Sequence, residues 1–183
     1  MTSQNRREFI KSAGLVFGSI ILFPSCLKNK NNYRFFTSEE TLCIIAICEQ
    51  IIPKDGSPGA TDAGVIYYID NQLSGVFYYD QEIYRNGILY LQKYCEKTYQ
   101  KPFQQLIPEK QTQLLKILES NQLTETDWPR GKPADFFNRI VGHTMQGFYG
   151  SPIHGGNKDY MSFTMLRIDY PLVIGQNRYV SNI

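Results

Sequence analysis

The sequence predicts an all-α fold, arranged as one irregular helical bundle over residues 37–183. Two observations carry this prediction. Apolar residues recur at helical spacing in several segments, and most of these segments open on a capping residue or a proline. In addition, no alternating apolar and polar run is long enough for a convincing β-strand, and the sequence shows no internal repeat.

The first predicted helix starts at a capping box, Thr37-Ser38-Glu39-Glu40. Pro53 ends it, because proline has no N–H with which to continue the helical hydrogen bonds. Its apolar positions indicate a mostly buried helix: Leu42, Ile44, Ile45, Ile47, Ile51 and Ile52. A turn-rich loop over 54–60 follows, and Thr61 is the expected cap of a second helix.

Three further helices are expected along the chain. The third runs from about Tyr79 to Tyr99. The fourth opens at Pro108, where Glu109 favours the positive end of the helix dipole. After an irregular link over 124–132, the fifth spans roughly Pro133–Tyr149.

The helical pattern breaks in the segment 147–157, which holds four glycines. Glycines let backbones approach each other closely or adopt positive φ. The interleaved aromatic residues can anchor such a loop in its own core or in a partner's pocket. The segment lacks the lysine, the spacing and the preceding strand of a P-loop, so phosphate binding is disfavoured. The sequence therefore predicts a glycine- and aromatic-rich loop region built for close contact.

The first 25 residues are typical of an export signal. Arg6 and Arg7 precede Phe9, Lys11 and an apolar run over Ala13–Phe23 that is too short to span a membrane. The paired arginines indicate the twin-arginine route, which exports folded cargo. Such export is needed when a protein gains a cofactor or a partner in the cytoplasm, so we expect either a cofactor carrier or an escort for one.

A lipid anchor is expected where the signal ends. Residues 22–26 are similar to a lipobox, in which Cys26 would become the lipidated N-terminus, although Phe23 and Pro24 depart from the usual pattern. A plain cleavage site with an incidental cysteine is the alternative. Residues 26–36 are mostly polar after Cys26, which favours a tether that follows a lipidated cysteine. Two acyl chains on Cys26 would suffice for stable membrane anchoring. We therefore expect a periplasmic or cell-envelope location.

Charge and cysteine content limit the possible functions. Beyond residue 25 the chain has sixteen basic and sixteen acidic residues, so no basic surplus suggests a nucleic-acid partner. Cys43, Cys48 and Cys95 allow at most one disulfide, from Cys95 to either of the other two, or else act as small buried hydrophobes. No pattern of cysteines and histidines predicts a zinc, iron–sulfur or haem site.

Catalytic candidates are few. His143 lies inside a predicted helix beside apolar residues, where a packed imidazole is the expected role. His154 in the glycine-rich segment is the better acid or base, with Ser151 nearby. A stand-alone enzyme using His154 is therefore one alternative, although no nucleophile elbow is present. A lipid-anchored carbohydrate-binding module, suggested by the many tyrosines, is another.

Two segments carry a family resemblance. The block Phe136–Pro171, with Gly-Phe-Tyr-Gly-Ser-Pro and His-Gly-Gly-Asn at its centre, resembles the gluconate 2-dehydrogenase subunit 3 family. The stretch 51–65 is similar to the first helix–loop–helix of the same family. Where relatives often have tyrosine and tryptophan, this chain has His154 and Phe163, which keep a bulky ring at each position.

The resemblance implies a non-catalytic small subunit of a membrane-associated dehydrogenase for sugars or polyols. Its partner would be a large FAD-containing subunit of the glucose–methanol–choline type, exported with the signal of the small subunit, and a cytochrome c would accept the electrons. This chain itself would hold neither FAD nor haem. The expected partner interface comprises Gly147, Phe148, Tyr149, Pro152, His154, Gly155, Gly156 and Asn157.

Overall fold

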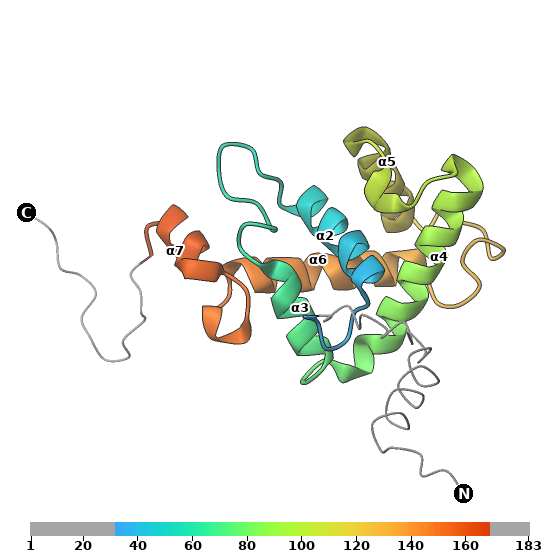
Figure 1. Cartoon of the computed structure of the whole chain (residues 1–183). Helices are drawn as coiled ribbons and strands as arrows, with labels where there is room; N and C mark the ends of the chain where they lie inside the picture. Colours follow the sequence, from blue (N-terminus) through green and yellow to red (C-terminus); the bar gives the residue numbers. More distant parts are fainter. Residues whose placement is uncertain (1–31, 169–183) are drawn as a thin grey trace, which may run out of the picture. The chain divides into compact units, whose positions relative to one another are not determined.

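The computed structural model describes residues 32–168, and Figure 1 shows that they form helices joined by loops. This part of the chain contains no β-strand, which confirms the all-α prediction. The predicted export residues Arg6 and Arg7 and the predicted lipidation site Cys26 lie outside the described residues. No helix within 32–168 combines the length and the apolar character needed to cross a membrane.

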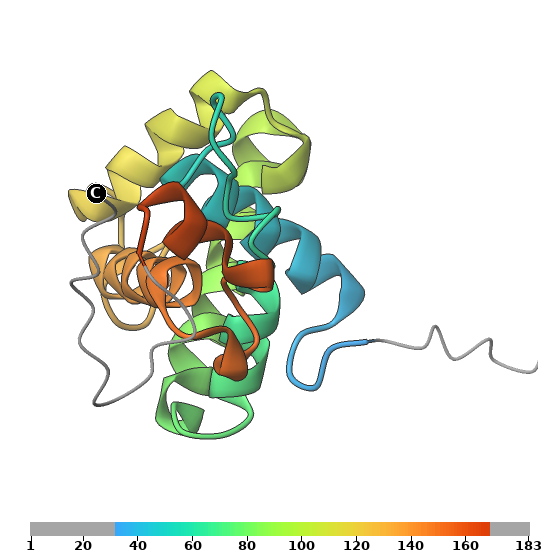
Figure 2. The same cartoon turned by 90° about the vertical axis from the view of Figure 1, so that its left-hand side faces the viewer.

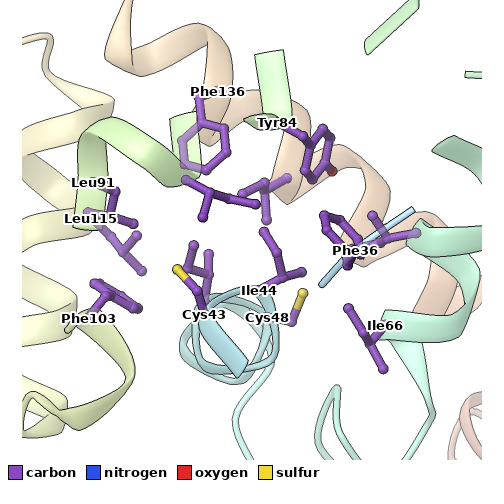
Figure 3. Close-up of a cluster of buried hydrophobic side chains, with 14 of the residues drawn as sticks. Phe36, Cys43, Ile44, Cys48, Ile66, Tyr84, Leu91, Phe103, Leu115 and Phe136 are labelled. Atoms are coloured by element: carbon purple, nitrogen blue, oxygen red, sulfur yellow. The ribbon is translucent and has the colours of Figure 1, made fainter. Parts of the chain in front are cut away.

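Helix α2 (Ser38–Ile51) starts where the sequence predicts. The Thr37 side chain accepts a hydrogen bond from the Glu40 N–H, and the Glu40 carboxylate accepts one from the Thr37 N–H, so the capping box is complete. Of the apolar positions predicted to be buried, Ile44 (Figure 3) and Ile47 lie in the core, and Ile45, Ile51 and Ile52 are half-buried. The prediction was wrong for Leu42, whose side chain is 54% exposed because it lies on the opposite side of the helix.

Helix α3 (Val65–Leu73) starts later than predicted. The prediction that Thr61 caps it was wrong, because Gly64 occupies the N-cap position with φ of 67°. The Thr61 hydroxyl instead donates to the Glu49 carboxylate at 2.6 Å, and the Thr61 N–H donates to the same oxygen at 3.1 Å. Thr61 therefore closes the loop after α2 onto the end of that helix.

The later helices follow the predicted boundaries closely. Helix α4 (Gln81–Tyr99) is preceded by one 3₁₀ turn at Tyr78–Asp80, and α5 (Pro108–Glu119) and α6 (Pro133–Tyr149) begin at the predicted prolines. Short 3₁₀ turns at Phe103–Gln105, Pro152–His154 and Lys158–Tyr160 and a last helix α7 (Met161–Met165) complete the described residues.

Helix α6 is the central element of the bundle. It packs against α2, α3, α4 and α5, as Figures 1 and 2 show from two directions. One helical face of α6 is buried and the opposite face is exposed. Figure 3 shows part of the core, with Ile44, Tyr84, Leu91 and Phe136 among its labelled side chains. The largest fully buried side chains come from these five helices, from the residue before Thr37 and from the 3₁₀ turn at Phe103: Phe36, Ile44, Ile47, Ile69, Leu73, Tyr84, Leu91, Phe103, Leu114, Leu118, Phe136 and Phe148.

The three cysteines in the described residues are buried free thiols. The possible disulfide between Cys95 and one of the other two does not form, and the alternative prediction of small buried hydrophobes is confirmed. Burial raises the pKa of the Cys43 thiol far above its usual range, and it raises the pKa of Cys48 and of Cys95 to about 12. These thiols are therefore protonated and unreactive in the folded chain.

Candidate partner-binding surface

The two segments that carry the family resemblance pack against each other. The Lys158 N–H donates to the Ala63 carbonyl at 3.0 Å, which joins the C-terminal loop to the turn before α3. Gly155 lies over α3 with φ of 103°, and a Cβ there would lie 2.6 Å from Asn71 Nδ2 and 3.3 Å from the Tyr67 carbonyl oxygen. The glycine is thus required both by its backbone angle and by this close approach.

Four of the residues predicted to face a partner lie in the interior of the chain. Gly147, Phe148, Gly156 and Asn157 are all buried in the free chain, so their place in a partner interface stays a prediction, while their observed contacts are internal. A Cβ at Gly156 would clash with the Gly147 backbone, and one at Gly147 would lie 3.0 Å from the Tyr68 ring. The glycines and the Phe148 ring therefore fix the loop onto its own core.

Asn157 holds the loop together from inside. Its Nδ2 donates to the Gly150 carbonyl at 2.8 Å, and its Oδ1 accepts the Ser162 N–H at 2.9 Å. Asn157 has a φ of 45°, and Asp159 and Tyr160 are also left-handed. Asparagine tolerates this region better than most residues, and its side chain here satisfies buried backbone groups at both ends of the loop.

The outer side of the loop presents a different set of residues. Tyr149 and His154 are exposed and Pro152 is half-buried. Ile153 is 80% exposed, and the sequence analysis did not single it out. Because Tyr149 and His154 are exposed in the same segment, the outer side of the loop offers a partly apolar contact surface. No hydrogen bond or ion pair joins His154 to a carboxylate within residues 32–168, so this histidine has no orienting group of the kind that a catalytic base uses.

A buried polar network lies where α4 and α6 meet. The Tyr84 hydroxyl is 2.9 Å from His143 Nδ1, and Asp80 Oδ1 is 3.3 Å from Arg139 Nε. His143 Nε2 lies 3.6 Å from Asp80 Oδ2, which is longer than a hydrogen bond. The Phe77 and Tyr84 rings stack on His143 with centroids at 4.8 and 5.8 Å.

Burial sets the charge states of this network. Burial, with a further contribution from the Arg139 charge, lowers the pKa of His143 to about 4, so the imidazole is neutral near pH 7. Burial also raises the pKa of Asp80, although the Arg139 guanidinium opposes that shift. Asp80 Oδ2 accepts no hydrogen bond. The expectation of a packed imidazole at His143 is confirmed, and its neighbours on α4 could not have been identified from sequence spacing.

The exposed face of α6 borders two adjoining hollows. One, of about 450 Å³, is lined by Phe77, Arg139, Gly142 and Gln146 among others. The second, of about 240 Å³, includes Tyr79. Both hollows are lined in part by Ile83 and Asp135, so they are neighbours on this face. Within residues 32–168 no cluster of three or more histidine, cysteine or acidic side chains could hold a metal ion.

Fold and surface define a class of protein: an all-helical domain whose glycine-rich loop is fixed from within and presents apolar residues outward. Comparison with protein families specifies the class further. The sequence model of gluconate 2-dehydrogenase subunit 3 matches residues 38–169, and the chain belongs to that family. A subunit of this kind implies a catalytic partner. Comparison with curated proteins and with solved structures gave no match.

Proposed function

We propose that this chain is a non-catalytic small subunit that binds and stabilises a large FAD-containing dehydrogenase subunit of the glucose–methanol–choline type. The flavoprotein is bound in the cytoplasm and crosses the membrane with the twin-arginine signal of this chain. The complex then acts in the periplasm or cell envelope on a sugar or polyol, with a cytochrome c as electron acceptor. FAD belongs to the partner, and Cys26 anchors the complex through lipid.

One observation supports the partner-binding role above the others. The C-terminal loop is fixed by buried Asn157 and by glycine contacts, while Tyr149, Ile153 and His154 point away from the core. An apolar surface on a rigid loop loses little conformational entropy on binding, which favours a stable interface. Family membership, which implies a catalytic partner, is the second support.

Replacing the paired arginines tests whether the flavoprotein is exported together with this chain. Arg6→Lys with Arg7→Lys keeps the charge but removes the feature that the twin-arginine receptor reads. With both polypeptides expressed together, we expect this chain and the flavoprotein to remain in the cytoplasm. Lys28→Arg in the tether is the matched control and leaves export unchanged. Export of the flavoprotein without this chain would contradict the escort role.

The loop interface is tested with exposed residues only. Tyr149→Ala, Ile153→Ser and His154→Ala, combined in one variant, should leave the unfolding temperature unchanged and weaken capture of the flavoprotein at least tenfold. Phe148 is left intact, because it is a core residue whose loss would unfold the loop. The purified chain should be colourless and inactive alone. Turnover of a sugar by the isolated chain would instead support the enzyme alternative.

A further inference from the structure

We infer a second contact surface for the catalytic subunit, the α6 face, which comprises the tip Val76–Tyr79, the half-buried Gly142 and the exposed residues Asp135, Asn138, Arg139, Gln146 and Tyr149. This inference rests on the proposed function, because it names where on this chain the same partner binds. Nothing in the family match or in the glycine-rich segment points to residues 76–79 or to Gly142.

The tip is apolar, exposed and rigid. Val76, Tyr78 and Tyr79 are 70%, 68% and 59% exposed. Between them Phe77 packs inward on His143, and its N–H donates to the Gln72 carbonyl at 2.8 Å. The buried Asp80 carboxylate pairs with Arg139 directly after the tip. Exposed tyrosines on such a fixed backbone are typical of interface hot spots, because burying them removes much apolar area at a low entropy cost.

The second observation is a glycine inside α6, Gly142, that no neighbouring residue explains. The other glycines inside long helices are explained by contacts within the chain, since Gly87 faces the Phe136 ring and Gly147 faces the Tyr68 ring. A Cβ at Gly142 would meet nothing within 4 Å. A glycine in a helix interior costs about 1 kcal/mol relative to alanine, and here no neighbour in the described chain requires it. Its bare backbone lines the 450 Å³ hollow, where a partner can approach closely.

Arg139 adds a charged contact in the same hollow. Its Nε lies 3.3 Å from Asp80 Oδ1, and 43% of its side chain is exposed to solvent. The guanidinium has five N–H donors, so its exposed part can also donate to a carboxylate or carbonyl group of the partner. We therefore expect the catalytic subunit to present an apolar recess for the tip and an acceptor oxygen for Arg139.

The α6 face leads directly into the C-terminal loop, so a single partner can contact both surfaces. Asp135, Gly142 and Tyr149 are seven residues apart on α6, so they lie on one helical face that leads from the tip to the C-terminal loop. A helix of this length extends about 25 Å. A stable interface buries roughly 800 Å² per partner, which takes about 20–30 residues a side, so a surface drawn from the tip, this helical face and the loop is favoured over the loop alone.

The test measures capture of the catalytic subunit by the full-length chain, with both expressed together, and the dissociation constant of the purified pair. One variant combines Tyr78→Ser and Tyr79→Ser, and a second carries Gly142→Gln, which fills the hollow in a space that the fold leaves open. The control combines Leu42→Ser and Leu89→Ser. These leucines are 54% and 47% exposed and line a separate hollow of about 780 Å³ between α2 and α4.

We expect each test variant to weaken binding at least tenfold and the control to stay within twofold of wild type, with unchanged unfolding temperatures for the tip variant and the control. Gly142→Gln should unfold no earlier than wild type. Normal binding by both test variants, or equal weakening in the control, would overturn the inference while leaving the proposed function intact. If the wild-type chain captures no flavoprotein, the proposed function fails and this inference fails with it.

Discussion

The Phe136 ring of α6 occupies the space beside Gly87 of α4 in which any other residue would carry its Cβ. This contact brings two long helices together in the core, next to the Tyr84 ring, which meets Phe136 edge to face with centroids 6.1 Å apart. The same two helices carry Tyr84, Arg139 and His143 of the buried polar network, and Asp80 lies at the N-cap of α4. Their close approach therefore fixes the hollow beneath the α6 face.

Gly87→Ala should destabilise the chain. The new Cβ would overlap an aromatic ring that is itself fully packed, so we expect a loss of roughly 1–3 kcal/mol in the free energy of unfolding. Gly142→Ala is the matched control in another helix interior. It meets open space and should be neutral or stabilise by up to about 1 kcal/mol. Urea unfolding of both variants checks this, and equal effects would contradict it.

The stability of the chain should fall in mild acid because of His143. Its pKa is lowered from 6.5 to about 4 in the folded chain, so the unfolded chain binds more protons between these values. The stabilising effect of neutral His143 is fully present above pH 6.5 and is lost as the pH falls through 4. The expected loss by pH 4 is roughly 2–3 kcal/mol. Urea unfolding at several pH values measures it.

His143→Gln isolates that contribution. Glutamine does not titrate, and its amide can still accept from the Tyr84 hydroxyl. The variant should be less stable at pH 7, yet its free energy of unfolding should depend less on pH between 6.5 and 4. Asp80, with its raised pKa, acts in the opposite direction in both proteins, so it does not produce the predicted fall of stability in acid. An unchanged pH dependence would show that His143 does not titrate in this way.

Asn157→Ala should loosen the C-terminal loop. The substitution removes the hydrogen bonds to the Gly150 carbonyl and from the Ser162 N–H, and it leaves both backbone groups without those partners, so we expect a loss of roughly 2–4 kcal/mol. Gln100→Ala is the control, because Gln100 also has positive φ but is exposed. Hydrogen exchange should rise over 150–162 in the Asn157 variant only. Unchanged exchange there would exclude the anchoring role.

The buried thiols should not react until the chain unfolds. In a Cys26→Ser background, an aromatic disulfide reagent should not react with Cys43, Cys48 or Cys95 in the native state. The reason is that each thiol is buried and protonated. After denaturation without reductant, mass spectrometry should find all three labelled. A pair that labels only after reduction would indicate a disulfide and contradict the free-thiol assignment.

Much of the fold was predictable because its signals are local. The Thr37 capping box and the prolines at 53, 108 and 133 mark helix ends through interactions within one turn, and α5 and α6 begin where those residues predict. The start of α3 was missed because Thr61 bonds to Glu49, twelve residues away. Sequence spacing does not show a contact of that kind.

The sequence by itself determined the all-α fold and the family, and it drew attention to the glycine-rich segment. Only the tertiary structure decided which residues of that segment are buried and which are exposed to a partner. Phe148 and Asn157 turn inward and Ile153 turns outward because Gly156 lets the loop fold back onto α6. The tip at 76–79 and the space at Gly142 likewise depend on how α3, α4 and α6 pack, since exposure is set by neighbours that lie far away along the chain.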